Sequence, residues 1–188
     1  MRPLVGILVG GAGRRMGHVA KGLLAVPGDG RPIVVRLSGL ASQLCCDAVL
    51  VGEHLAYRGL GLVQIPDDPP GVGPIGGVRA LLKHADSLGL PAAIVLACDM
   101  PFITVELLGR LLAEAPQAQL LAPRRSHWEL LCARWSTRCL PALDAAIAAE
   151  SHALQAIADA IDATELPMIL SDGAQSLIDW DLPTDPHS

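Results

Sequence analysis

The chain has 188 residues, a net charge of −5 at neutral pH and a composition that is 51% hydrophobic but only 3% aromatic. This length is typical of one domain, so we expect a single unit over residues 1–188 that ends in a short tail at about 186–188. The negative charge excludes the broad basic surface typical of nucleic-acid binders, so no nucleic acid is expected as a partner. The longest apolar runs, Leu4 to Val9 and Ala92 to Ala97, fall far short of the roughly 20 residues that span a bilayer. No membrane partner is expected either.

Five cysteines occur without the CxxC spacing of a zinc knuckle, and their odd number argues against a framework of disulfides. They are Cys45, Cys46, Cys98, Cys132 and Cys139. Free thiols fit a reducing compartment, so the sequence predicts a cytoplasmic protein.

Short apolar runs alternate with longer segments of helical periodicity. The predicted strands are Leu4 to Val9, Ala48 to Val51, Leu62 to Ile65, Ala92 to Ala97, Gln119 to Ala122 and Leu130 to Arg134. The predicted helices are Ile33 to Leu44, Ile75 to Ala85, Val105 to Glu114 and Leu140 to Ala149. This alternation is typical of βαβ units, and small aliphatic side chains suit a parallel sheet covered on both faces. The predicted fold class is α/β: a single Rossmann-like, three-layer domain with a mostly parallel sheet.

Three loops after the predicted strands have unusual chemistry. They are Gly10 to Gly22 after the first strand, Pro66 to Gly77 after the third and Cys98 to Phe102 after the fourth. Ligands of open α/β sheets bind at the carboxyl ends of the strands. We therefore expect these three loops to meet around one ligand.

The first loop combines glycines with three cations. Leu8 and Val9 lead into Gly10, Gly11 and Gly13, which are followed by Arg14, Arg15 and Lys21. Glycines let backbone amides approach an anion closely, and the cations can neutralise a polyphosphate. The loop is not a P-loop, because Ala20 precedes the lysine, and Met16 stands where a dinucleotide fingerprint needs its third glycine. The alternative is an ordinary glycine turn flanked by solvated arginines.

The second loop carries two adjacent carboxylates, Asp67 and Asp68, before a helix that opens near Pro74 to Gly77. Proline suits the first helical turn, whose free amides can face a nucleotide. The alternative is an ordinary surface loop.

In the third loop, a buried strand delivers Asp99 to its carboxyl end, and Pro101 stops the strand. A carboxylate at this place is suited to Mg²⁺, which takes oxygen ligands and keeps substrate phosphates in its shell. The alternative is that Asp99 caps the helix that begins near Thr104.

The three loops resemble motifs of the molybdenum cofactor guanylyltransferases. The signature GGxSxRMGxxK is matched by Gly10, Gly11, Arg14 or Arg15, Met16, Gly17 and Lys21, with Gly13 nearest to the absent serine. An Asp followed by GPLxG is matched by Asp67, Gly73, Pro74, Ile75 and Gly77. The motif CDMPF is matched letter for letter at 98–102. The resemblance covers most of the chain and implies a Rossmann-like domain.

The resemblance implies that Asp99 is a ligand of a Mg²⁺ cofactor and that Lys21, Arg14 and Arg15 stabilise charge on a triphosphate. The implied nucleotide-binding residues are Leu8, Val9, Gly10, Gly11, Gly13, Lys21, Asp67, Pro74, Gly77 and Asp99. Segment 176–186 resembles the family's closing NxNTPED motif. Its Asp181 is either a second metal ligand or a solvated carboxylate.

Segment 125–135 resembles a family stretch that faces the acceptor. It offers His127, Trp128 and Trp135 as acceptor-binding candidates, with Leu130 in place of the usual proline and Trp135 in place of a tyrosine. An indole or imidazole ring can stack on a pterin or bond to it. The alternative is that these are packing residues.

The reaction implied by the resemblance is transfer of GMP from GTP to the terminal phosphate of molybdopterin, with release of pyrophosphate. The implied partners are GTP, a molybdopterin-type phosphorylated acceptor, and molybdoenzymes or other proteins of the cofactor pathway. Two alternatives stay open. One is cytidylyl or other nucleotidyl transfer to molybdopterin or another phosphorylated small molecule, and the other is a non-catalytic nucleotide-binding module.

Overall fold

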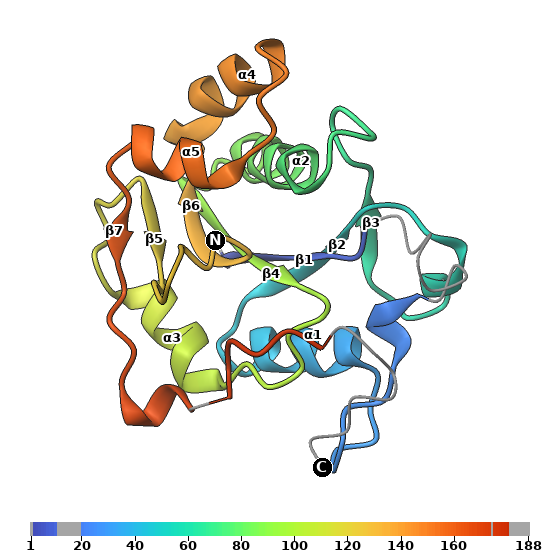
Figure 1. Ribbon diagram of the computed structural model, residues 1–188. Coiled ribbons are helices and arrows are strands. Elements are labelled where there is room, and N and C mark those ends of the chain that lie inside the picture. The colour runs from blue at the N-terminus through green and yellow to red at the C-terminus, as the bar shows by residue number, and fades with distance from the viewer. Residues whose placement is uncertain (1, 11–19, 174, 181–188) are drawn as a thin grey trace.

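The computed structural model describes residues 2–10, 20–173 and 175–180. These residues form one α/β domain in which a central sheet lies between two layers of helices (Figure 1). The predicted fold class, a three-layer domain with a mostly parallel sheet, is confirmed.

The sheet has the strand order β3-β2-β1-β4-β6-β5-β7. Its strands are β1 (Leu4–Leu8), β2 (Asp47–Val51), β3 (Val63–Ile65), β4 (Ala92–Ala97), β5 (Leu120–Ala122), β6 (Cys132–Ser136) and β7 (Thr164–Glu165). Among these described strands, only β6 runs antiparallel to its neighbours. The sixth predicted strand begins and ends two residues before β6, and β7 has no predicted counterpart.

The helices of the described residues cover both faces of the sheet (Figure 1). On one face lie α1 (Ile33–Gln43) and α3 (Val105–Ala113), and on the other lie α2 (Pro74–Ser87), α4 (Leu140–Ala148) and α5 (Leu154–Ala160). The four predicted helices are confirmed to within two residues at their ends. Helix α5 has no predicted counterpart, although its apolar residues at 154, 157, 158 and 161 have helical spacing.

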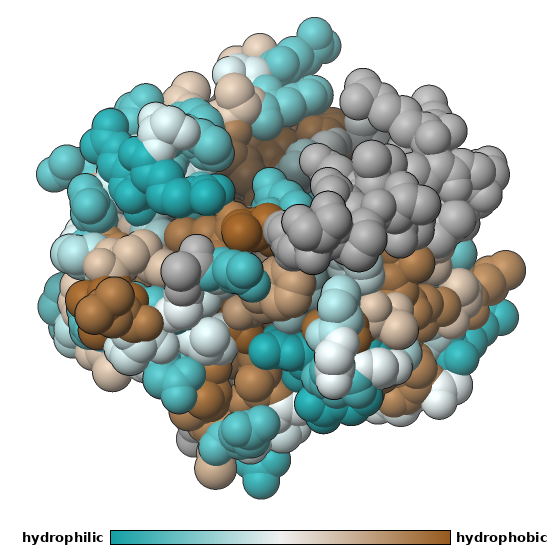
Figure 2. All heavy atoms as spheres, turned by 60° about the horizontal axis from the view of Figure 1, so that its bottom comes forward, coloured by the Kyte–Doolittle hydropathy of each residue, from teal (hydrophilic) through white to brown (hydrophobic). Residues whose placement is uncertain are grey.

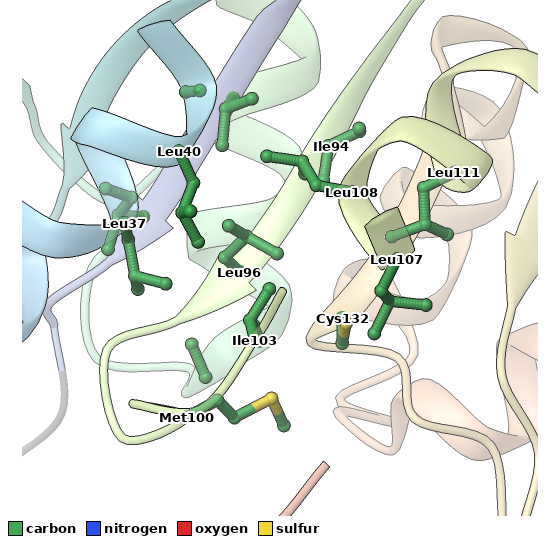
Figure 3. Close-up of a cluster of buried hydrophobic side chains, with 14 of the residues drawn as sticks. Leu37, Leu40, Ile94, Leu96, Met100, Ile103, Leu107, Leu108, Leu111 and Cys132 are labelled. Atoms are coloured by element: carbon green, nitrogen blue, oxygen red, sulfur yellow. The ribbon is translucent and has the colours of Figure 1, made fainter. Parts of the chain in front are cut away.

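The buried side chains form one cluster on each side of the sheet. Successive residues of β1 point to opposite faces, so Ile7 joins one cluster and Leu8 the other. Figure 3 shows the cluster between the sheet and the helices α1 and α3, to which α1 contributes Leu37, β4 contributes Leu96 and α3 contributes Leu107. All three are completely buried, and each such leucine stabilises the fold by about 1.5–3 kcal/mol relative to an exposed one.

Helices α2 and α3 follow the second and third loops, and each begins with a residue suited to a helix start. Pro74 occupies the first position of α2, where its missing N–H is not needed. The hydroxyl of Thr104 caps α3 by accepting the N–H of Leu107 at 3.2 Å. Thr104 thus provides the cap for which Asp99 was the alternative candidate.

Large exposed hydrophobic side chains are scattered over several elements: Leu55, Val63, Leu88, Ile169 and Leu170. On the face shown in Figure 2, hydrophobic residues are interspersed with hydrophilic ones. Within the described part of the chain, no helix combines the length and hydropathy needed to cross a bilayer.

Candidate active site

The site lies where the strand order reverses, because the chain runs from β1 toward one edge of the sheet and from β4 toward the other edge. β1 pairs with β2 on one side and with β4 on the other. Directly after these strands, the N–H of Cys98 donates to the C=O of Leu8 at 3.2 Å, and the N–H of Val9 donates to the C=O of Val51 at 2.8 Å. The loops after β1 and β4 therefore start side by side, at the place where open α/β sheets bind their ligands.

Lys21 and Asp99 come from these two loops and meet. The Nζ atom of Lys21 lies 4.0 Å from Oδ2 of Asp99, and the two side chains are 27% and 29% exposed. A cation and a carboxylate at such partly exposed positions can both reach a bound substrate. The expectation that the first and third loops converge is confirmed.

A turn with a buried glycine, Gly22, holds Lys21 in place. Lys21 opens the 3-10 helix η2 (Lys21–Leu23), and the N–H of Gly22 donates to the hydroxyl of buried Tyr57 at 3.2 Å. Burial raises the pKa of Tyr57 to about 12, so this hydroxyl stays protonated. A Cβ atom at Gly22 would lie 2.4 Å from Cγ1 of Val34, so glycine is required for this close packing.

Asp99 follows β4 and touches the end of the described chain. Its C=O accepts the N–H of Trp180 at 2.7 Å. Burial and, second, the charge of Asp99 raise the pKa of the neighbouring Cys98 thiol to about 12. Cys98 is therefore neutral at physiological pH and is not suited to act as a nucleophile.

The second loop brings Asp67 to the same end of the sheet. One carboxylate oxygen of Asp67 lies 2.8 Å from where a Cβ atom of Gly10 would be, and the other lies 3.2 Å from the equivalent position at Gly77. Burial raises the pKa of the Asp67 carboxyl above its ordinary value. All three predicted loops thus meet, and three predicted nucleotide-binding residues are close neighbours.

The adjacent Asp68 has a different role. Arg79 Nη1 and Lys83 Nζ each lie 2.7 Å from its Oδ2 atom. Arg79 also pairs with Asp144 of α4 at 2.6 Å. The hydrogen bond from Lys83, followed by the charges of both cations, lowers the pKa of Asp68. Asp68 therefore connects the second loop to α2, in agreement with the resemblance, which assigned Asp67 alone to the nucleotide.

A pocket of about 310 Å³ opens beside Asp99. Its lining includes two predicted acceptor residues, His127 and Trp128. It also includes residues that sequence reasoning did not select, of which the polar ones are Glu129, His152, Gln155 and Asp179. Asp179 belongs to the segment that resembles the closing family motif, and His152 and Gln155 belong to the segment around α5.

Trp135 is not part of this pocket. Its side chain is completely buried among the residues between the sheet and helices α2 and α4, and its indole Nε1 donates to the C=O of Leu130 at 3.0 Å. Because this completely buried ring does not line the pocket, the prediction that Trp135 contacts the acceptor is wrong.

Several predicted site residues lie outside the described residues: Gly11, Gly13, Arg14, Arg15 and Asp181. In the part of the chain that is described, no group of three or more His, Cys, Asp and Glu side chains is arranged to hold a metal ion. Mg²⁺ does not require one, because it is usually held by one or two carboxylates together with substrate phosphates and water. Asp99 and Asp179, which line the same pocket, fit this donor set.

Comparison with known proteins decides the family. The family model for the MobA-like NTP transferase domain matches residues 5–164. The chain belongs to the MobA-like NTP transferase family. It is 38% identical over 148 residues to the molybdenum cofactor guanylyltransferase of Rhodobacter capsulatus, covering 78% of this chain and 75% of that protein. It is 32% identical over 170 residues to the probable molybdenum cofactor guanylyltransferase of Mycobacterium tuberculosis, covering 88% and 84%.

A solved structure shows the same likeness in three dimensions. The molybdopterin-guanine dinucleotide biosynthesis protein A of Archaeoglobus fulgidus superposes on this MobA-like chain with a TM-score of 0.70 and 26% identity, over 87% of this chain and 83% of that one.

Proposed function

We propose that this MobA-like protein transfers GMP from GTP to the terminal phosphate of molybdopterin and releases pyrophosphate. The observation that carries the proposal is the meeting of Lys21 with Asp99 beside a pocket lined by His127 and Trp128. This arrangement gives a triphosphate a cation and a metal-binding carboxylate, and it leaves adjacent space for an acceptor. The guanylyltransferase relatives in Rhodobacter capsulatus and Mycobacterium tuberculosis support this choice of substrates.

In the proposed reaction, an oxygen of the acceptor phosphate attacks the α-phosphorus of GTP while the bond to the β-phosphate oxygen breaks. The acceptor phosphate is already ionised at neutral pH, so no side chain has to remove a proton. Lys21, with Arg14 and Arg15, donates hydrogen bonds to phosphate oxygens on which charge develops. Asp99, together with Asp179 or Asp181, would hold Mg²⁺, which neutralises triphosphate charge when bound.

Asp67, Pro74 and Gly77 are proposed to lie along the base and ribose of the nucleotide. Asp67 offers a carboxylate that can accept hydrogen bonds from N–H or O–H groups. The N-terminal end of α2, which begins at Pro74, favours negative charge nearby. His127 and Trp128 are proposed to contact the acceptor. The free cysteines favour the cytoplasm as the place of this reaction.

Asp99→Asn tests the proposal. With GTP, Mg²⁺ and molybdopterin, wild-type protein should release pyrophosphate, and Asp99→Asn should lower kcat by about 100-fold or more, because the neutral amide binds the metal weakly. Lys21→Ala in the same assay should cost about 3–4 kcal/mol of transition-state stabilisation. Asp47→Asn is the matched control, because Asp47 is exposed and its ion pair with Arg2, at 3.6 Å, lies on the surface. Full Mg²⁺-dependent activity of Asp99→Asn would show the assignment to be wrong.

A further inference from the structure

The tip of the β5–β6 hairpin forms one wall of the pocket. We define this hairpin tip as residues 124–128; Arg124 and Trp128 form its closing antiparallel bridge. Within it, the N–H of Arg125 donates to the C=O of His127 at 3.0 Å. His127 and Trp128 line the pocket that also contains Asp99. The position of this tip therefore decides the shape of the space next to Asp99.

One side chain of α5 holds the backbone of the tip. The N–H of Trp128 donates to Oε1 of Gln155 at 3.1 Å, and Nε2 of Gln155 donates to the C=O of Trp128 at 2.7 Å. One helical turn further along α5, Oδ1 of Asp159 accepts the indole N–H of Trp128 at 3.4 Å. Helix α5 thus fixes both the backbone and the ring of Trp128.

The opposite side of the tip is tied to other parts of the chain. Arg125 donates through Nη2 to the C=O of Leu177 at 2.9 Å and through Nε to the buried carboxylate of Glu129 at 2.7 Å. The guanidinium of Arg124 lies 4.8 Å from the centroid of the Trp128 ring. These contacts hold Arg124 and Arg125 in place. The backbone N–H and C=O of Trp128 bond to Gln155 instead.

We propose that Gln155 is a positioning residue for the acceptor: it holds Trp128 and His127 at the distance from Asp99 that the acceptor requires. This inference rests on the proposed function, in which the acceptor is a phosphorylated pterin. Both described hydrogen bonds of Gln155 go to Trp128, so its removal should loosen the acceptor wall. The nucleotide loops have separate anchors, Tyr57 under Gly22 and the ion pairs of Asp68. Affinity for the acceptor should therefore change while affinity for GTP does not.

Steady-state kinetics of Gln155→Ala and Gln155→Glu would test this role. For Gln155→Ala, the KM for molybdopterin should rise about tenfold, which corresponds to about 1.4 kcal/mol, while kcat and the KM for GTP change by less than about twofold. Gln155→Glu keeps an oxygen that can accept the N–H of Trp128 but has no donor for the C=O of Trp128. The KM of this variant for molybdopterin should therefore lie between those of wild type and Gln155→Ala. Gln43→Ala, at the exposed end of α1, is the control that should behave as wild type.

A binding measurement without turnover separates this inference from the proposed function. The Kd for molybdopterin is measured without GTP from the fluorescence of the pterin. The Kd values of wild type, Gln155→Glu and Gln155→Ala should rise in the same order as their KM values. If wild-type protein binds molybdopterin but releases no pyrophosphate, the proposed function fails while the comparison of Kd values still decides the role of Gln155. An unchanged Kd in both Gln155 variants, or an equal loss of affinity for GTP and acceptor, would overturn the inference. Absence of any binding by wild-type protein would overturn both.

Discussion

Asp67 and Asp68 are adjacent in the sequence but have opposite electrostatic environments. Asp68 is paired with two cations, and its pKa is lowered. Burial raises the pKa of Asp67, so keeping this carboxylate charged costs the fold stability. A residue that destabilises the fold at neutral pH and faces Gly10 and Gly77 is typical of a group retained for binding.

Asp67→Asn should therefore stabilise the protein at neutral pH. Because the pKa of Asp67 is higher in the folded state than its ordinary value of 3.8, ionisation favours the unfolded chain. The penalty is absent below this value, where both states are protonated, and it grows as the pH rises through the folded-state pKa. Urea unfolding of variant and wild type should show a gain in stability at neutral pH that disappears in acid, together with weaker GTP binding. A less stable variant at neutral pH would contradict this interpretation.

At the scale of the elements, a side chain of β6 caps the C-terminal end of α3. The guanidinium of buried Arg134 donates through Nη1 to the C=O groups of Leu111 and Glu114, each at 2.8 Å, and through Nη2 to that of Ala115. These carbonyls have no partner within the helix, and a cation at a helix C-terminus also interacts favourably with the helix dipole. Arg134 therefore couples the antiparallel strand to the helix layer.

Arg134→Met should lower the free energy of unfolding by about 3 kcal/mol, because the aliphatic length is kept while several buried carbonyls lose a charged donor. Arg138→Met is the matched control, since Arg138 also donates to a backbone carbonyl, that of Gln117 at 2.6 Å, but in an exposed position. We expect its cost to be below about 1 kcal/mol. Urea unfolding measures both values, and equal costs would exclude a special role for the buried cap.

The segment after β7 is anchored to α3 before it reaches the site. Arg110 of α3 pairs with the buried carboxylate of Asp172, and Thr104 donates to the C=O of Asp172 at 3.1 Å. Beyond this anchor, the chain runs to Asp179 in the pocket and to Trp180, which bonds to Asp99. A segment distant in the sequence thus supplies a further carboxylate, that of Asp179, to the pocket that contains Asp99 and Glu129.

Considered as a whole, the protein places the loops proposed to bind the nucleotide at one end of a shared sheet, so ligand binding should stabilise the entire fold. At a GTP concentration of about 100 times its Kd, binding adds about 2.7 kcal/mol. For a chain of this size, this should raise the thermal midpoint by about 5–10 °C. A thermal-shift panel of GTP, CTP, ATP and UTP with Mg²⁺ should show the largest shift with GTP. A larger shift with CTP would favour cytidylyl transfer, and a shift without pyrophosphate release would favour a nucleotide-binding module.

Local patterns in the amino-acid sequence are sufficient to predict the layers, most strands and helices, and the three loops that form the site. Apolar periodicity reports which local structure can bury a face, and strand ends in an α/β sheet place loops together by rule. For this reason Lys21, Asp67 and Asp99 could be assigned to one site from their positions after predicted strands.

The direction of β6, the burial of Trp135 and the link between Gln155 and Trp128 depend instead on how distant segments pack. A short apolar run does not encode whether it pairs parallel or antiparallel, nor which of its side chains face a helix. Trp135 and Trp128 both belong to the buried cluster on the α2 side of the sheet, yet Trp128 also lines the pocket and Trp135 does not. Such differences arise from contacts between segments far apart in the chain, which no local pattern contains.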